Sequence, residues 1–266
     1  MKFSIIGTGF ILPAHVEAIR DIKGEIIDVV NDAHEKDAWK KMVSTTSADY
    51  IVILAPNDLH FEMAKAAADA GKIVLCEKPL TIRLEDAKVL AEKPNIFTVL
   101  QLRYHTDVEK MKKEISKSSG KKNDIEMDIS IYRDEKYHRG WKGQKERSGG
   151  VLFNLGVHYF DLLLHLFGEA KTAKIETLDE KTATGTIEGG NYACKWRVSV
   201  AENKDNQRRI FKINGRQYNF SSKDNLSYEN LHRFVYRDLL QNKGVGPKEA
   251  LKSIELIEKL YKSYEK

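Results

Sequence analysis

Short apolar runs alternate with amphipathic stretches over residues 3–100, and this alternation constrains the fold more than any other feature of the chain. The apolar runs are rich in β-branched residues and lie at 3–6, 26–30, 51–54, 73–75 and 97–100. Their length and composition predict buried parallel strands. The intervening stretches have helical patterns, and the clearest covers 59–70, with Asn57 or Asp58 placed to cap its start. Strand and helix in alternation predict βαβ units and a doubly wound sheet.

A second pattern begins after residue 105. Apolar and polar residues alternate over 125–131, which predicts a half-exposed strand, and an apolar helix follows over 151–167. The dipeptide Asn214-Gly215 predicts a two-residue hairpin turn. We therefore predict an α/β protein with two domains: a Rossmann-type doubly wound parallel sheet over 1–105, and an α+β domain with a mostly antiparallel sheet over 106–266.

Composition excludes several classes of function. The 44 Lys and Arg residues are scattered among 39 Asp and Glu residues, for a net charge of +5. They are therefore not concentrated in a basic patch of the kind that binds nucleic acid. The two cysteines cannot form a disulfide framework, and no His/Cys cluster has the spacing of a metal site. No apolar run approaches the ~18 residues of a membrane-spanning helix, and no cleavage site follows the apolar start. We expect a cytoplasmic protein that binds no nucleic acid, membrane or metal.

The sequence Gly7-Thr8-Gly9 lies between the first predicted strand and a helical pattern. Glycines at this point permit a tight turn and let main-chain N–H groups approach a pyrophosphate at the helix N-terminus. The third glycine of the dinucleotide fingerprint is absent, because Leu12 and Pro13 occupy that region. A plain strand-to-helix turn is the alternative. Asp32, at the end of the second strand, could accept hydrogen bonds from a ribose and would favour NAD over NADP, or could simply be a turn residue.

Polar residues also follow the third and fourth predicted strands. The sequence Ala55-Pro56-Asn57 comes after the third strand with His60 three residues on, and Glu77-Lys78-Pro79 comes after the fourth. Doubly wound sheets bind ligands at these carboxyl ends. Lys78 could take part in proton transfer there, whereas Asn57 could equally be only a helix cap and His60 only a first-turn residue.

A third polar group lies on the apolar helix that follows Gly149-Gly150. Asn154, His158 and Asp161 are spaced i, i+4 and i+7, which places them on one stripe of an α-helix. A single histidine on an apolar helix is more often a satisfied core residue. Three aligned polar residues instead favour a stripe that faces a cleft or solvent.

Together, these motifs resemble those of the Gfo/Idh/MocA oxidoreductases. The resemblance rests on Gly7-Thr8-Gly9 with His15, on 55–60, on 77–80 and on 149–161, in that order along the chain. It implies a nicotinamide-dependent sugar or polyol dehydrogenase whose second domain carries an open sheet that commonly forms a dimer interface, hence a homodimer or homotetramer. It also implies NAD contacts from Gly7, Gly9, Phe10, Ile11, Asp32, Ala55, Pro56, Asn57, His60, Glu77, Lys78 and Gln101.

Narrower motifs are similar to one branch of that family, the UDP-N-acetylglucosaminuronate 3-dehydrogenases of surface-polysaccharide and lipopolysaccharide biosynthesis. They are 76–80, 100–105, 139–143 and 154–158; Asn154 replaces the Asp of many relatives. We expect that Lys78 positions and polarises the hydroxyl group that is oxidised and that His158 takes its proton, or that the two residues share the proton. Substrate contacts are expected from Lys78, Arg103, Arg139, Lys142, Asn154 and His158.

Two alternatives stay open. The substrate could be an inositol, a free sugar or another aminosugar nucleotide, although Arg103 and Lys142 argue for a charged one. The chain could also be a nicotinamide-binding sensor without turnover, although such a protein is expected to have lost Lys78 or His158. The sequence leaves open whether NADH leaves after each turnover or is reoxidised in place by an acceptor such as 2-oxoglutarate.

Overall fold

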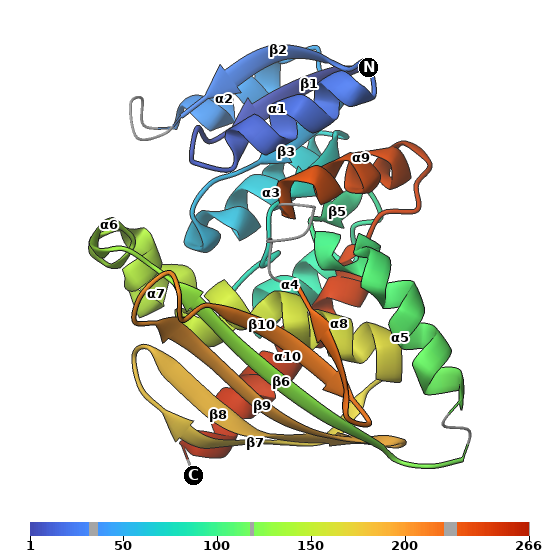
Figure 1. Ribbon diagram of the computed structural model, residues 1–266. Coiled ribbons are helices and arrows are strands. Elements are labelled where there is room, and N and C mark those ends of the chain that lie inside the picture. The colour runs from blue at the N-terminus through green and yellow to red at the C-terminus, as the bar shows by residue number, and fades with distance from the viewer. Residues whose placement is uncertain (32–36, 118–119, 221–227, 266) are drawn as a thin grey trace. The chain divides into compact units, whose positions relative to one another are not determined.

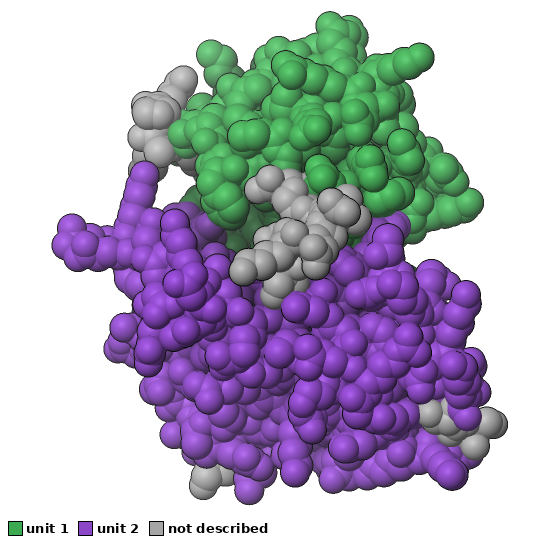
Figure 2. Space-filling model, viewed as in Figure 1, with its two compact units in different colours: residues 1–101, 226–251 green, residues 102–225, 252–266 purple. Residues whose placement is uncertain are grey.

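The computed structural model describes residues 1–31, 37–117, 120–220 and 228–265, and the chain divides into two compact units (Figure 2). Unit 1 comprises 1–101 and 226–251, and unit 2 comprises 102–225 and 252–266. This division differs from the predicted boundary at 105/106, because 226–251 group with the first unit. The physical reason is that helix α9 (His232–Leu240) packs on helix α1 (Leu12–Asp21) and bonds to it through side chains.

Unit 1 contains a five-stranded parallel sheet with the order β2-β1-β3-β4-β5, which confirms the predicted doubly wound fold. The strands are β1 (Lys2–Ile6), β2 (Glu25–Val30), β3 (Tyr50–Ile53), β4 (Ile73–Cys76) and β5 (Ile96–Thr98). The strand order reverses at β1 and β3, and the carboxyl ends of these two strands are where such sheets bind ligands.

The helices of unit 1 follow the predicted alternation. They are α1, α2 (Ala38–Thr45), the 3₁₀ turn η1 (Asn57–Leu59), α3 (His60–Asp69), α4 (Leu84–Ala91) and, from the chain's second half, η6 (Tyr228–Leu231) and α9. The core between sheet and helices is closed, because Phe3, Ile5 and Ile51 on the strands and Ile19 on α1 are all fully buried. Burial of each such side chain stabilises the fold by roughly 1.5–3 kcal/mol.

Unit 2 contains a six-stranded sheet with the order β11-β10-β6-β9-β8-β7. Its strands are β6 (Asn123–Tyr132), β7 (Ala170–Leu178), β8 (Thr182–Gly189), β9 (Tyr192–Ala201), β10 (Arg208–Ile213) and β11 (Arg216–Asn219). The β6–β9 pair is parallel and the other pairs are antiparallel, as predicted for a mostly antiparallel sheet. Asn214 and Gly215 both have positive φ and join β10 to β11, so the predicted hairpin turn is confirmed.

Helices cover one face of this sheet, and Figure 1 shows α8 (Val157–Phe167) and α10 (Pro247–Tyr264) lying along it. Aromatic side chains form the contact, because Phe160 on α8 meets Trp196 on β9 with ring centroids 5.3 Å apart. The remaining helical segments are η2 (Gln101–Tyr104), α5 (Thr106–Lys117), α6 (Glu135–Arg139), η3 (Trp141–Gly143), α7 (Lys145–Ser148) and the π-helical turn η4 (Leu152–Gly156).

The helical stretch Lys145–Phe167 is long and apolar enough to cross a membrane by length and composition alone. However, 67% of its most apolar window is buried inside the fold. Core helices of globular proteins pass the same test, and the packing of α8 on the sheet accounts for the apolar composition of this stretch.

Candidate active site

The loop after β1 forms a cradle for a dinucleotide. Gly7 has a φ of +106°, and a Cβ there would lie 2.7 Å from main-chain atoms of Leu54, so this position requires glycine. At Gly9 a Cβ would meet no described atom within 4 Å, which leaves room for a ligand beside the main chain. The first turn of α1, all of it described, has no acidic residue and its N-cap makes no side-chain capping bond. Its N–H groups therefore suit a pyrophosphate.

The other predicted cofactor residues near this loop have mixed placements. The ring of Phe10 is 75% exposed, and Ile11 is the N-cap residue of α1. Asp32 lies outside the described residues, so its role in choosing NAD over NADP stays a prediction.

The segment after β3 packs against the segment after β4 through His60. His60 is fully buried, and its two ring nitrogens lie 2.7 Å from the carbonyl oxygen of Pro79 and 2.9 Å from that of Ala55. Burial lowers the pKa of His60. Because both nitrogens contact the main chain, His60 is better placed to position the neighbours of Lys78 and Asn57 than to touch a cofactor with its own ring.

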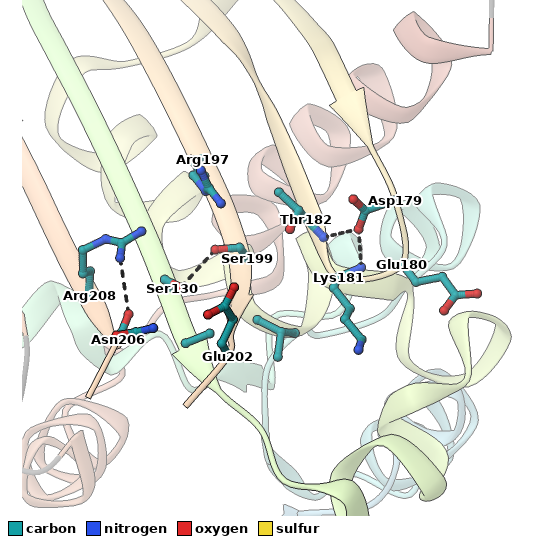
Figure 3. Close-up of a pocket in the computed structure, with 12 residues that line it drawn as sticks. Ser130, Asp179, Glu180, Lys181, Thr182, Arg197, Ser199, Glu202, Asn206 and Arg208 are labelled. Carbon is teal, nitrogen blue, oxygen red and sulfur yellow. Dashed lines mark hydrogen bonds between the residues drawn. The ribbon is translucent and has the colours of Figure 1, made fainter. Parts of the chain in front are cut away.

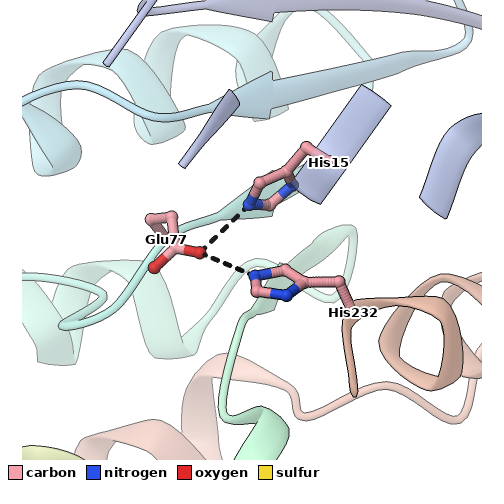
Figure 4. A group of neighbouring side chains, drawn as sticks. All are labelled: His15, Glu77 and His232. Atoms are coloured by element: carbon pink, nitrogen blue, oxygen red, sulfur yellow. Dashed lines mark hydrogen bonds and ion pairs between the residues drawn. The ribbon is translucent and has the colours of Figure 1, made fainter. Parts of the chain in front are cut away.

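Glu77 lies at the centre of a buried hydrogen-bond network that Figure 4 shows. Its Oε1 accepts from His15 Nε2 at 3.0 Å and from His232 Nε2 at 3.4 Å, and its Oε2 accepts from the main-chain N–H of Lys78 at 3.1 Å. The other ring nitrogen of His15 lies 2.8 Å from the hydroxyl of Tyr236. Besides the adjacent N–H of Lys78, this network holds Glu77 from two distant segments of the chain, helices α1 and α9.

The electrostatics of this network agree with its geometry. Burial opposes ionisation of Glu77, but the bonds from His15 and His232 hold the pKa of its carboxyl group well below the usual range. Burial lowers the pKa of His15 and raises that of Tyr236. A neutral His15 therefore accepts a hydrogen bond from the hydroxyl group of Tyr236 and donates one to Glu77. Potential metal-ligand atoms of His15, Glu77 and His232 lie within 4.8 Å of one another, a spacing that could hold a metal ion. The hydrogen bonds alone already account for this arrangement.

Lys78 and Gln101 complete the candidate cofactor residues of unit 1. Lys78 lies two residues after the end of β4 and is partly exposed. Gln101 is 4% exposed, and its Oε1 has no hydrogen-bond partner within the described part of the chain. A buried acceptor without a partner is costly, so a ligand that supplies an N–H donor, such as a carboxamide, fits this position.

In unit 2, Asn154 and His158 form the accessible part of the predicted polar stripe. Every other residue of 151–160, a range that is fully described, is buried. The local helix is not the regular α-helix that the spacing predicted, because 152–156 form a π-helical turn and the α-helix begins at Val157. Such turns occur frequently at functional sites, because they reset the direction of neighbouring side chains.

The third member of the predicted stripe is not accessible. Asp161 is 2% exposed and accepts two hydrogen bonds from Arg103, from Nε at 2.8 Å and from Nη2 at 2.7 Å. This bidentate pair uses the Nε–Nη2 edge of the guanidinium group, so Asp161 fixes the orientation of Arg103. Arg103 is therefore placed to hold the helix that carries His158.

The remaining predicted substrate residues lie on the segment before the π-helical turn. Arg139 is exposed and forms an ion pair with Glu135. Lys142 lines a cavity of about 510 Å³ together with Asn154, Tyr137 and Lys181, and its main-chain oxygen accepts a hydrogen bond from Asn154. A second cavity, of about 670 Å³, lies on strands of the same unit and includes Arg197, Ser199 and Arg208, but none of the predicted site residues (Figure 3).

Two family models match this chain. Residues 1–95 match the model described as an oxidoreductase family with an NAD-binding Rossmann fold, and residues 109–216 match the Gfo/Idh/MocA C-terminal domain. The chain belongs to the Gfo/Idh/MocA family. The predicted family, the oxidoreductase class and the NAD-binding Rossmann domain are thereby confirmed.

Solved structures and curated relatives of Gfo/Idh/MocA proteins differ in what they bind. The WlbA (WbpB) dehydrogenase from Thermus thermophilus in complex with NAD and UDP-GlcNAcA has a TM-score of 0.85 and 25% identity, covering 97% of this chain and 94% of that one. The same protein in complex with NAD and α-ketoglutarate has a TM-score of 0.84 and 26% identity, covering 96% and 92%. The curated scyllo-inositol 2-dehydrogenase (NADP(+)) IolW of Bacillus subtilis is 28% identical over 59% of this chain and 45% of its own length. The chain spans about half the length of the first curated relatives it matches.

Sequence reasoning missed two residues of the buried network around Glu77. His232 and Tyr236 complete the network around Glu77, yet they follow it by more than 150 positions. The available signal was a histidine and a tyrosine spaced i, i+4 on a helical pattern, which many core helices also show.

Proposed function

We propose that this protein is an NAD-dependent dehydrogenase that oxidises the 3-hydroxyl of UDP-N-acetylglucosaminuronate to the 3-keto form. The observation that carries the proposal is the likeness, over nearly the whole chain, to a dehydrogenase crystallised with NAD and this nucleotide sugar. The accessible pair Asn154 and His158 supports it, because Asn154 is the residue expected at that position in the nucleotide-sugar branch. A role in polysaccharide precursor synthesis in the cytoplasm, as a homodimer or homotetramer, is part of the same proposal.

The reaction requires a proton to leave the oxygen as a hydride leaves the carbon. Bound NAD supplies the hydride acceptor. We assign to His158 the role of accepting this proton, and to Lys78 that of orienting and polarising the hydroxyl group. Glu77 and His60 hold the main chain on either side of Lys78, so the lysine side chain starts from a fixed position.

The test is turnover of the purified protein with NAD and UDP-N-acetylglucosaminuronate, with and without 2-oxoglutarate, followed by NADH absorbance and product mass. We expect a product two mass units lighter than the substrate, because one hydride and one proton are lost. If 2-oxoglutarate reoxidises bound NADH in place, product forms without net NADH. Absence of product while NAD still binds would contradict the nucleotide-sugar proposal.

A second substrate class is favoured by the curated inositol dehydrogenase relative. We therefore include scyllo-inositol in the assay, with NADP beside NAD, because that relative uses NADP(+) by name. Turnover of scyllo-inositol, and not of the nucleotide sugar, would assign the chain to this alternative.

Three variants test the assigned residues. Lys78→Met and His158→Asn should retain NAD binding and lose turnover by about 10²-fold or more. His165→Asn is the matched control, since His165 is an exposed histidine on the same helix α8 and should turn over normally. Normal turnover in both active-site variants would overturn the assignment. NAD binding without any turnover in the wild type would instead support the sensor alternative.

A further inference from the structure

The side-chain amide of Asn154 joins two segments of unit 2. Its Nδ2 donates to the main-chain oxygen of Lys142 at 2.9 Å. Lys142 is the middle residue of the 3₁₀ turn η3, and both residues line the cavity of about 510 Å³. The bond therefore runs from the helix that carries His158 to the wall of the cavity.

The turn that Asn154 holds has little freedom of its own. Within it, Gly143 N–H donates to Gly140 and Gln144 N–H donates to Trp141, both at 3.1 Å. A Cβ at Gly143 would lie 2.0 Å from the carbonyl oxygen of His138, so the chain there packs against α6 without space for a side chain. The turn therefore moves as a unit, and a bond at its middle residue sets where that unit lies.

We propose that Asn154 is a specificity-determining residue, which holds the η3 turn in place by donating its amide N–H to Lys142. A carbonyl oxygen can only accept a hydrogen bond, so the residue at 154 must supply a donor. An ionised aspartate at this position would set two acceptors against each other and would push the turn away. The choice between Asn and Asp at 154 thus determines the position of Lys142 in the cavity wall.

This inference rests on the proposed function only for the identity of the substrate. Lys142 brings a cation to the wall, with its Nζ 5.8 Å from the ring centre of Tyr137 and 5.5 Å from that of Trp141. Displacing the turn moves this cation together with Trp141, which belongs to the same turn, and changes its distance from Tyr137 on α6. The expected effect is on affinity for a charged substrate, while the chemical step at His158 changes less.

The first measurement needs no substrate. Hydrogen–deuterium exchange of the ligand-free protein should show faster exchange of the Gly143 and Gln144 amides when the bond is lost, by about fivefold in Asn154→Ala and about tenfold or more in Asn154→Asp. Asn95→Asp is the matched control. Asn95 donates to the carbonyl oxygens of Ala68 and Lys72 in unit 1, so the same substitution there should leave exchange over 139–145 unchanged.

The second measurement is steady-state kinetics with UDP-N-acetylglucosaminuronate. Asn154→Asp should raise KM by about tenfold and change kcat by less than about threefold. Unchanged exchange at Gly143 and Gln144 in both Asn154 variants would overturn the proposal. Faster exchange in a protein whose wild type does not turn over this substrate would support the positioning role and contradict the proposed function, so the two failures are distinguishable.

Discussion

The buried pair Arg103–Asp161 offers a quantitative test of how unit 2 holds its site. The Asp161 side chain is 2% exposed and that of Arg103 is 12% exposed, and two hydrogen bonds of 2.8 Å and 2.7 Å join them. Replacing Arg103 by Met keeps the length of the side chain and leaves a buried carboxylate without its cation. Breaking a buried pair on one side costs about 3–5 kcal/mol, because the remaining charge stays desolvated. Arg103→Met should therefore lower the free energy of unfolding by about this amount.

The control for this prediction is the double variant Arg103→Met/Asp161→Leu. Removing both charges eliminates the uncompensated carboxylate, so stability should return to within about 1–2 kcal/mol of the wild type. Urea unfolding followed by tryptophan fluorescence measures both variants, since Trp196 is buried in the core of the same unit. A loss below about 1 kcal/mol in the single variant, or a double variant no more stable than the single one, would refute the reasoning. A raised KM at unchanged stability would instead restore Arg103 as a substrate ligand.

Three further predictions follow from buried groups and from the cofactor loop. Burial lowers the pKa of His15 and of His60, so on acidification these histidines take up protons in the unfolded chain before they do so in the folded one. The free energy of unfolding should therefore fall below about pH 6.5, by up to about 1.4 kcal/mol per pH unit for each histidine. A urea midpoint that rises in acid would contradict this. Gly7→Ala forces a side chain against main-chain atoms at a residue with positive φ. This variant should lower the free energy of unfolding by more than about 2 kcal/mol and abolish NAD binding measured by calorimetry. The control Gly9→Ala should fold like the wild type. Both cysteines are buried, and burial raises the pKa of each thiol. A thiol reagent should therefore label neither cysteine in the native protein and both in denaturant. Labelling of the native protein would contradict this by showing that a thiol is accessible.

The sequence predicts the parts of the fold that depend on local pattern. The five strands of unit 1 are short, apolar and β-branched, and the Asn214-Gly215 turn has a strong local preference, so both could be located before the structure was known. The π-helical turn at 152–156 was not predictable, because its apolar residues fit an α-helix equally well. The spacing predicted a stripe of Asn154, His158 and Asp161, and the structure leaves the first two partly exposed and buries Asp161.

Side-chain pairing across long sequence separations could not be predicted. Arg103 carries a guanidinium group suited to a substrate anion, and only the structure shows that Asp161 accepts hydrogen bonds from its Nε and Nη2 atoms. His232 and Glu77 are 155 positions apart, and a single sequence contains no signal that joins them. Local chemistry therefore identifies candidate residues, whereas tertiary packing decides which of them remain available to a ligand.

Residues 226–251 belong to unit 1 although they follow most of unit 2 in the sequence, and this order has a consequence for the biosynthesis of the protein. A nascent chain that has reached residue 101 already contains β1 to β5 and the Glu77–His15 pair, but it lacks His232 and Tyr236. The dinucleotide-binding unit therefore cannot acquire its complete set of buried hydrogen bonds until translation has passed almost the whole of unit 2. A gene fragment that ends at residue 101 is consequently a poor choice for isolating this unit. A fusion that joins 1–101 to 228–251 restores the missing donors.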